Sequence, residues 1–397
     1  MSCFFSKSVR YFLTFFLGIY SLFIVGCEMT DSEGQPPRQI TSVAIGPKDD
    51  RMVFSYNDGT IRYFNVLAGK NDQLTYFEQK LPLPFLTNAR SLAFSMDGKK
   101  LLAIEDVGDT DKIWIWDLSD LNRLPSAFFR SKESQGKITN VSFSPDGSKI
   151  AIGTSGPEVV EILDVSSGKK LLTLHHTFGG DNKVYFMPST SPSVYRILVV
   201  EKTGQLILWT LSAPLTLYKE LWAASRELCQ QLPMPESYAG YEMRDVQASS
   251  DGTSLYYSSV LSEAKRKLKP AYLLTLLDTS EIPDFSRAWF YQGSPVTDES
   301  SVDLKVPRCS AARNNLGAFA VCTRTDDEGH MRTVLVEKSD SGPASTEQSS
   351  EYQTFREGEV ALEHMSPEGS LVVVVPVLGP LEIYRRDNLL IKVEIPL

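Results

Sequence analysis

Four histidines are the first candidates for acid–base or metal chemistry in this chain. They stand at His175, His176, His330 and His364. The first two follow a predicted outer strand, and neighbours on a strand point to opposite faces, so this pair is poorly placed to chelate one ion. The other two are isolated in the sequence. The histidines therefore predict neither a metal site nor a catalytic centre.

A cluster of carboxylates is the second candidate, because oxygen ligands could bind a cation. It consists of Glu105, Asp106, Asp109 and Asp111, in a segment expected to form the loop between two strands. Calcium loops place their ligands at a regular spacing, and this segment lacks that spacing. We interpret the cluster as a solvated loop. We predict no bound metal and no cofactor.

Catalytic motifs are the third kind of signal. The sequence contains no GxSxG, HExxH, GxGxxG or GxxxxGK[ST] pattern, which are the spacings that position nucleophiles, zinc ligands and phosphates in common enzymes. The absence of these patterns favours a function other than catalysis. We therefore predict that the protein is not an enzyme.

The N-terminus predicts export and anchoring. Lys7 and Arg10 precede an apolar run at 11–25, which fits a signal peptide and is too short to span a bilayer as a helix. The residues 24–27, Ile-Val-Gly-Cys, resemble the lipobox of bacterial lipoproteins. This resemblance implies a signal peptide at 1–26 and acyl chains such as palmitate on Cys27; two chains suffice for stable anchoring. An uncleaved anchor and an ordinary secretory signal are the alternatives.

Composition limits the partners of the mature chain. Residues 27–38 are polar and contain two prolines, Pro36 and Pro37, so they are expected to form a flexible tether. The chain has a formal net charge of −9, and loss of the signal makes it more negative, which argues against nucleic-acid binding. We expect a lipid-anchored protein of the bacterial envelope, at the outer membrane facing the periplasm or the cell surface.

Three cysteines follow the tether, at Cys229, Cys309 and Cys322. The last two flank a predicted turn and fall on strands expected to be neighbours, so they could form a disulfide in an oxidising compartment. Two buried thiols are the alternative. The chain has no CxxC pair or Cys/His cluster, so the cysteines predict no zinc site.

A repeated pattern of short strands organises the rest of the chain. It is clearest in SLAFSMDGKKLLAI at 91–104 and NVSFSPDGSKIAIG at 140–153. Equivalent first-strand positions recur at intervals of 43 to 63 residues, at Ile45, Phe94, Phe143, Phe186, Ala248, Ala311 and Met365. A WD repeat needs about 40 to 45 residues for a four-stranded blade, so each interval can hold one blade.

Apolar character on both strand faces favours a propeller. The segments LVVVV at 371–375 and IWIW at 113–116 need cover on both sides, which neighbouring blades provide. One exception is 217–228, where apolar spacing could form a helical face. Its first half could equally be the outer strand of the fourth blade.

Residues 39–397 resemble the WD-repeat family in its bacterial form. The resemblance rests on SFSPDG at 142–147, the Trp116-Asp117 pair and TGQLILWTL at 203–211. It implies an all-β, WD40-like β-propeller of seven blades, with six or eight as alternatives. The chain lacks Gly-His pairs and has one Trp-Asp pair, so the family's Asp-His-Ser-Trp hydrogen-bond set is not carried over.

Long loops on a rigid scaffold are frequent binding sites. Propeller topology places the loops between second and third strands, and the connections between blades, on one face. We expect one sector of that face to hold a basic loop, an acidic loop and an aromatic insertion at 223–244. The candidate partner-binding residues are Lys265, Arg266, Lys267, Lys269, Asp326, Asp327, Glu328, Tyr238 and Tyr241. Solvated loops that pair with each other are the alternative interpretation.

The sequence thus predicts a lipid-anchored propeller that serves as a platform for an unidentified envelope protein. The first alternative is a propeller enzyme, a periplasmic hydrolase or oxidoreductase that uses the central channel. The second is an outer-membrane assembly factor or a glycan binder.

Overall fold

The computed structural model describes most of the chain after residue 38. The described residues are 39–48, 50–68, 74–82, 89–131, 136–155, 159–175, 182–189, 191–201, 205–218, 220–222, 228–232, 241–248, 254–261, 272–278, 289–292, 308–314, 317–325, 331–338, 351–366, 369–377 and 379–396. Contacts along the chain separate a unit at Met1–Pro37 from a unit at Arg38–Leu397. Within the described ranges, no helix combines the length and apolar character needed to cross a membrane.

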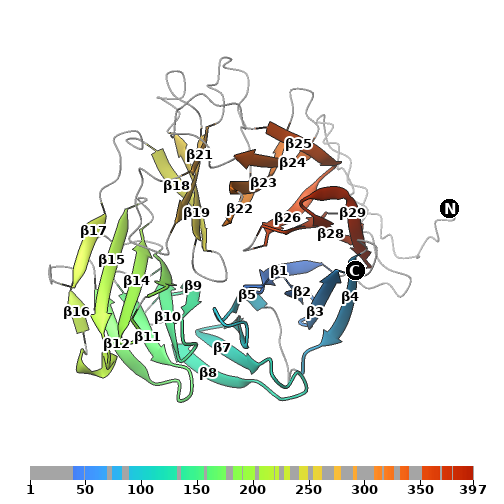
Figure 1. The fold of residues 1–397 in the computed structure, drawn as a ribbon. Coiled ribbons are helices and arrows are strands. Elements are labelled where there is room, and N and C mark those ends of the chain that lie inside the picture. The colour runs from blue at the N-terminus through green and yellow to red at the C-terminus, as the bar shows by residue number, and fades with distance from the viewer. Residues whose placement is uncertain are drawn as a thin grey trace, which may run out of the picture. The chain divides into compact units, whose positions relative to one another are not determined.

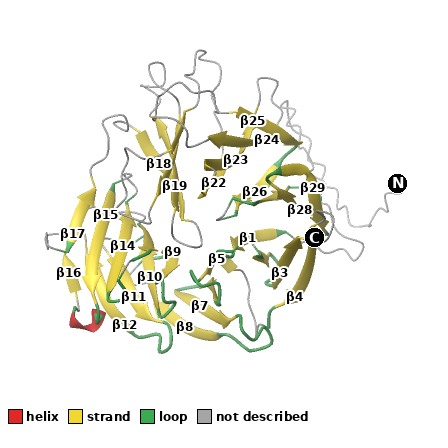
Figure 2. Cartoon of the chain, in the orientation of Figure 1, coloured by secondary structure: helices red, strands yellow, loops and turns green. Residues whose placement is uncertain are grey.

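The described part of the chain folds almost entirely into strands, with one short 3-10 helix, η2 (Leu215–Leu217) (Figure 2). The strands form seven sheets, which follow one another along the chain (Figure 1). Sheet one contains β1 (Ile40–Ile45), β2 (Arg51–Tyr56), β3 (Ile61–Ala68) and β4 (Leu74–Lys80). Sheet two contains β5 (Ala89–Phe94), β6 (Lys100–Val107), β7 (Thr110–Asp117) and β8 (Ser126–Ser131).

Sheet three contains a fifth strand, which comes from the part of the chain between two strands of sheet four. Sheet three contains β9 (Ile138–Phe143), β10 (Lys149–Thr154), β11 (Val159–Asp164), β12 (Lys170–His175) and β16 (Glu220–Trp222). Sheet four contains β13 (Lys183–Met187), β14 (Val194–Val200), β15 (Leu206–Ser212) and β17 (Cys229–Leu232). All neighbours in these sheets are antiparallel except β12 and β16, which pair in parallel.

Sheets five to seven keep the four-stranded order. Sheet five contains β18 (Tyr241–Ala248), β19 (Ser254–Leu261), β20 (Tyr272–Asp278) and β21 (Trp289–Gln292). Sheet six contains β22 (Arg308–Asn314), β23 (Gly317–Thr325), β24 (Met331–Lys338) and β25 (Glu351–Glu357). Sheet seven contains β26 (Val360–Met365), β27 (Leu371–Pro376), β28 (Leu381–Arg385) and β29 (Asn388–Ile395).

Apolar side chains fill the spaces between neighbouring sheets. Separate clusters join sheet one to two, two to three, three to four, and six to seven. Trp116 and Trp209 are the largest fully buried side chains. All six residues of β27 are buried, because this strand is covered on both faces. The pattern of buried second strands between neighbouring sheets is that of a β-propeller.

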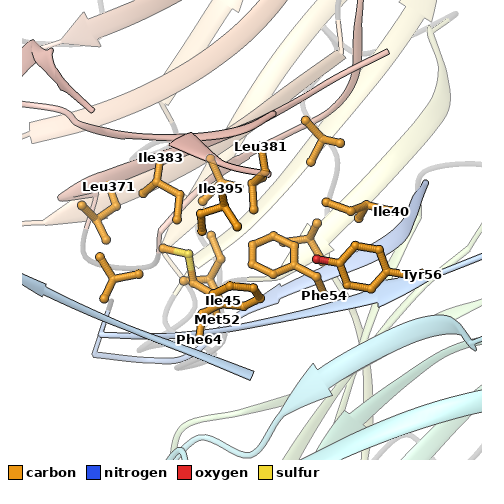
Figure 3. Close-up of a cluster of buried hydrophobic side chains, with 14 residues drawn as sticks. Ile40, Ile45, Met52, Phe54, Tyr56, Phe64, Leu371, Leu381, Ile383 and Ile395 are labelled. Carbon is orange, nitrogen blue, oxygen red and sulfur yellow. The ribbon is translucent and has the colours of Figure 1, made fainter. Parts of the chain in front are cut away.

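Side chains also join sheet seven to sheet one. Phe54 and Tyr56 of β2 lie in one cluster with Ile383 of β28 and Ile395 of β29, as Figure 3 shows. Sheet one contains only β1–β4 and sheet seven only β26–β29, so these two sheets share no strand among the described residues. Burial of each large apolar side chain contributes about 1.5–3 kcal/mol, and this packing is what holds the first and last sheets together.

The fold class predicted from the sequence is confirmed. The seven predicted first-strand positions all lie in the first strands of the seven sheets, β1, β5, β9, β13, β18, β22 and β26. Seven blades stay a prediction for the ring, supported by the seven sheets that the described residues form.

The Asp-Gly turns between first and second strands have a repeated hydrogen-bond pattern. In sheet three, the Ser144 hydroxyl donates to Asp146 at 2.5 Å and accepts from the Lys149 amide at 2.9 Å. Gly147 has φ +63°, a conformation that favours glycine. Burial raises the pKa of Asp146, but the hydrogen bonds from Ser144 and Ser148 outweigh it and bring the pKa below its usual value.

The prediction of a helix at 217–228 was wrong. Of the described residues in and next to this segment, Leu215–Leu217 forms a single 3-10 turn and Glu220–Trp222 forms a strand. Its alternative, an outer strand of the fourth blade, was also wrong, since β16 pairs with β12 of sheet three and the outer strand of sheet four is β17. Leu221 is half-buried and packs on the cluster between sheets three and four. Leu221 is therefore apolar because it packs from a strand against this cluster, and not because it lies on the face of a helix.

Candidate protein-interaction face

Basic residues that start the second strands reach from one sheet to the next. Arg51 donates to the carbonyl of Gly98 at 3.0 Å, and Lys100 donates to the carbonyl of Gly147 at 3.0 Å. The two contacts are equivalent, because both donors begin a second strand and both acceptors lie in the next sheet's first turn. Sheets one, two and three therefore run in the same direction.

The first strands of sheets three and four are aligned in the same way. Asn140 of β9 contacts the main chain of Val184 of β13, and two residues later Ser142 accepts from the amide of Phe186 at 2.9 Å. Contacts that advance by two residues on both strands show that β9 and β13 are parallel neighbours. Loops between second and third strands therefore emerge at the same end of sheets one to four.

This loop face displays short turns with exposed apolar side chains. Asp58 organises the turn between β2 and β3 by accepting from both the amide and the hydroxyl of Thr60, at 2.8 and 2.6 Å. Val107, the last residue of β6 before the turn to β7, is 43% exposed, and Val377, after β27, is 48% exposed. Each valine lies where the second strand of its sheet meets the connection to the third strand, and exposed apolar side chains are common in protein interfaces.

Sequence reasoning missed these two valines as candidates. The available signal was an apolar side chain inside a short connection otherwise made of glycine and polar residues, as at 107–111, where the letters are VGDTD. In the sequence, such a valine is indistinguishable from the last residue of a buried strand. Val107 is in fact the last residue of β6, but its side chain is exposed.

Two of the four clustered carboxylates are buried, so their interpretation as a solvated loop was wrong. The strands extend further than expected and leave only a tight turn around Gly108 and Asp109. Glu105 is 4% exposed and accepts from the Trp114 indole at 2.9 Å. Asp111 is fully buried and accepts from the Ile138 amide at 3.2 Å. Asp111 thus ties sheet two to the first strand of sheet three.

The other two carboxylates of that cluster do lie at the surface. Asp109 is exposed, and Asp106 forms an ion pair with Lys137 at 3.7 Å. The four carboxylates therefore do not converge on one point. Among the residues that the structure describes, no group of three or more His, Cys, Asp or Glu side chains could hold a metal ion.

The basic and acidic loop residues lie outside the described residues, as does Tyr238. Their flanking strands are described. Lys265, Arg266, Lys267 and Lys269 stand between β19 and β20, whose ends pair through Val260 and Tyr272. Asp326, Asp327 and Glu328 stand between β23 and β24, whose ends pair through Thr325 and Met331. Both segments thus connect the second and third strands of their sheets, while their role in binding stays a prediction.

The predicted insertion at 223–244 required Tyr241 to lie in a connection between sheets, and this prediction was wrong. Tyr241 is the first residue of β18 and pairs with Leu261 of β19. The predicted insertion also contains β17, the outer strand of sheet four, at Cys229–Leu232. The insertion is therefore shorter than expected, because β17 and the start of β18 occupy part of it.

One histidine of the adjacent pair belongs to a described strand. His175 is the last residue of β12 and pairs with Trp222 of β16. It therefore lies in a strand with a paired neighbour and not in a surface connection. His176 and His330 lie outside the described residues. His364 is in the first strand of sheet seven.

Polar side chains on the described first strands serve structural contacts. Thr41 donates to the carbonyl of Ala89 at 3.3 Å, Thr139 donates to the carbonyl of Asn182, and Asn140 and Ser142 bind main-chain groups of β13. These groups join one sheet to the next, which leaves them poorly placed to act on a substrate.

No family model matches the chain, and no curated protein matches it. Among solved structures, it is similar to Kuenenia stuttgartiensis hydrazine synthase, with TM-score 0.53 and 10% identity over 87% of this chain and 95% of that one. The match supports a shared fold alone.

Two further solved structures are also similar. The β-propeller domain of Myceliophteria thermophila Cps50 (Swd1) has TM-score 0.45 and 15% identity, over 78% of this chain and 86% of that one. The WD40 repeats of RRP9 have TM-score 0.49 and 12% identity, over 85% and 86%. By its own sheets and their packing, the chain is a β-propeller.

Proposed function

We propose that this chain is a bacterial envelope protein anchored through lipid on Cys27, and that its propeller binds a partner protein through the loop face. The observation that carries the proposal is the common direction of the sheets, fixed by the contacts from Arg51 to Gly98, Lys100 to Gly147 and Asn140 to Val184. A common direction gathers one loop from each aligned sheet on the same face.

The point at which the first described strand begins supports this choice of face. The first described strand begins at Ile40, which pairs with Tyr56 at the end of β2, so the chain enters the propeller at the loop face. The tether at 27–38 spans at most roughly 40 Å when fully extended. A molecule anchored through Cys27 would therefore hold this face within reach of the membrane. The partner that we propose is another protein of the envelope.

The chemistry of the face favours a protein partner over a small substrate. The described loop end of sheets two and three combines an exposed apolar side chain, Val107, with charged surface residues such as Asp109 and Lys137. Protein interfaces have this composition of an apolar centre and a polar rim. The basic loop at 265–269 and the acidic loop at 326–328 add opposite charges that would select a complementary partner.

Membrane anchoring is tested by the variant Cys27→Ser in the native host. Lipid attachment requires the thiol, so the variant should leave the membrane fraction for the soluble fraction after cell lysis. Cys3→Ser is the matched control, because it removes a thiol from the same signal segment and should leave fractionation unchanged. Full membrane retention of Cys27→Ser would disprove anchoring through Cys27.

Partner binding is tested by reversing Lys265, Arg266 and Lys267 to glutamate. Affinity capture from the envelope, followed by mass spectrometry, should then lose the partner that the unaltered protein retains. The control reverses Lys99, Arg123 and Lys169, which are exposed in turns at the opposite end of sheets two and three, and changes the net charge equally. Loss of the partner in both variants, or in neither, would disprove binding of the partner through the loop face.

A further inference from the structure

Cys322 differs from the free cysteine of this propeller. It lies in β23, is 3% exposed and is disulfide-bonded. Cys229 in β17 is a free thiol, and burial raises its pKa to about 11. One other cysteine belongs to the propeller, Cys309 in β22, and the strand register places it directly opposite Cys322.

We propose that Cys309 and Cys322 form a cross-strand disulfide that joins the first two strands of sheet six, and that the propeller acquires it in an oxidising compartment. Residues directly opposite each other in an antiparallel pair have Cα atoms about 4.5–5.5 Å apart. A disulfide requires about 4.4–6.8 Å. The register between β22 and β23 therefore meets the requirement without any movement of the backbone.

The bond lies on the side of sheet six that faces away from sheet seven. Phe319 and Val321 of β23 pack in the cluster with sheet seven, and successive side chains on a strand point to opposite faces. Cys322 therefore points to the other face, where β22 also contacts β19 and β20 of sheet five. A bond buried at this position is shielded from solvent reductants in the folded protein.

The oxidation proceeds by thiol–disulfide exchange with a protein disulfide oxidant. The thiolate of one cysteine attacks the oxidant's disulfide, which forms a mixed disulfide and releases one thiol of the oxidant. The second cysteine's thiolate then attacks the mixed disulfide and displaces the oxidant's other sulfur. The propeller loses two electrons and two protons, and the oxidant gains them as a dithiol. Because Cys322 is buried in the finished sheet, the exchange must precede final packing.

This inference deepens the proposed function by assigning a compartment independently of Cys27. Disulfides form and persist in the periplasm and outside the cell, and they are rare in the cytosol. Export would be required for the bond even if no lipid were attached. Exported but unlipidated protein would still contain the bond.

The test is differential alkylation of the full-length protein made in its native host and purified from the envelope. The protein is denatured without reductant and alkylated with one reagent, then reduced and alkylated with an isotopically distinct reagent. Trypsin cleaves after Arg308, Arg313 and Arg324, so Cys309 and Cys322 fall in separate peptides. A second, unreduced digest is searched for the two peptides joined by a disulfide.

We expect Cys229 to carry the first reagent and both Cys309 and Cys322 to carry the second, with the joined peptide in the unreduced digest. Labelling of Cys309 and Cys322 by the first reagent would overturn the inference, as would a peptide joining either of them to Cys229. The state of Cys27 is read separately, since an unlipidated Cys27 would itself be alkylated. Failure of lipid anchoring is thereby distinguished from failure of the disulfide.

Discussion

Asn140 holds the main chain of Val184 in the neighbouring sheet through two hydrogen bonds. The Val184 amide donates to Oδ1 at 2.8 Å, and Nδ2 donates to the Val184 carbonyl at 2.8 Å. A side-chain amide thus replaces the two main-chain bonds that a neighbouring strand would supply. The contact fixes the alignment of β9 and β13, and with it the placement of their loops on a common face.

Replacement of Asn140 by alanine should lower the free energy of unfolding by about 1–3 kcal/mol, because the Val184 amide and carbonyl lose their partners. Chemical denaturation followed by tryptophan fluorescence measures the effect. Ser119→Ala is the control, since it removes an exposed turn hydrogen bond, from Ser119 to Asp117 at 2.6 Å, and surface changes of this kind stay within about 0.5 kcal/mol. Equal effects of the two variants would contradict the role of Asn140.

Gly153 permits the close approach of sheets three and four. A Cβ atom at this position would lie 2.4 Å from the carbonyl oxygen of Asn182 and 2.7 Å from Oδ1 of Asn140. Gly153→Ala should therefore destabilise the propeller by about 1–3 kcal/mol or more through overpacking, measured as a lower midpoint of thermal unfolding.

Gly108→Ala is the matched comparison for Gly153. Its Cβ would meet nothing within 4 Å, and its φ is +57°, so its cost is limited to the strained backbone, about 1–2 kcal/mol. If Gly108→Ala lowered the midpoint more than Gly153→Ala, the close approach of the two sheets at Gly153 would be disproved.

An ion network centred on the buried carboxylate of Glu382 joins sheets six and seven. The carboxylate accepts from Arg356 at 2.7 Å, from the Tyr384 hydroxyl at 2.9 Å and from Lys392 at 3.1 Å. Burial raises the pKa of Glu382, but the hydrogen bonds from Arg356, Lys392 and Tyr384 outweigh it and lower the pKa below its ordinary value. Burial first, and the nearby charge of Glu382 second, raise the pKa of Tyr384 to about 12.

The lowered pKa of Glu382 predicts a loss of stability in acid. A carboxyl group with a lower pKa in the folded state stabilises the protein above its unfolded pKa, which is about 4.5 for glutamate, and this contribution disappears as the pH falls through the folded pKa. Unfolding free energies measured from neutral pH downwards should decline less steeply in Glu382→Gln than in the unaltered protein. Parallel curves would show that Glu382 does not contribute to the acid sensitivity.

The disulfide of sheet six should stabilise the propeller through the loop that it closes. A cross-link between Cys309 and Cys322 closes a loop for which the chain-entropy relation gives about 3 kcal/mol. The double variant Cys309→Ser, Cys322→Ser should lose about this amount in denaturant unfolding under oxidising conditions.

Cys229→Ser serves as the control for that variant, because it removes a thiol that forms no disulfide. Its unfolding should respond to added reductant as the unaltered protein does, whereas the double serine variant should not respond. Equal sensitivity of all three proteins to reductant would argue against the cross-link.

Short-range patterns in the sequence predicted the strands and their turns well. The letters SFSPDG at 142–147 predicted the turn in which Ser144 and Asp146 interact, because Asp-Gly turns rely on neighbouring residues alone. The first strand of every sheet was predicted for the same reason. Apolar residues on both strand faces predicted burial between sheets, as in the fully buried β27.

Long-range pairings were the source of the errors. Leu221 has the spacing of a helical face, yet β16 leaves its own sheet to pair with β12. Glu105 and Asp111 look like solvated loop residues, yet the Trp114 indole and the Ile138 amide bind them in the interior. The strand β12 is distant from β16 along the chain, Ile138 lies in another sheet, and Trp114 lies on the adjacent strand β7. The spacing of residues within a single segment encodes none of these partners.

The sequence by itself determined a chain of similar four-stranded units, the apolar faces that must be covered and the segments that connect the strands. Only the tertiary structure decided how neighbouring sheets align, through contacts such as Asn140 with Val184 and Arg51 with Gly98. The physical reason is that turns and strand burial depend on neighbouring residues, whereas alignment depends on side chains that reach main-chain groups more than forty residues away.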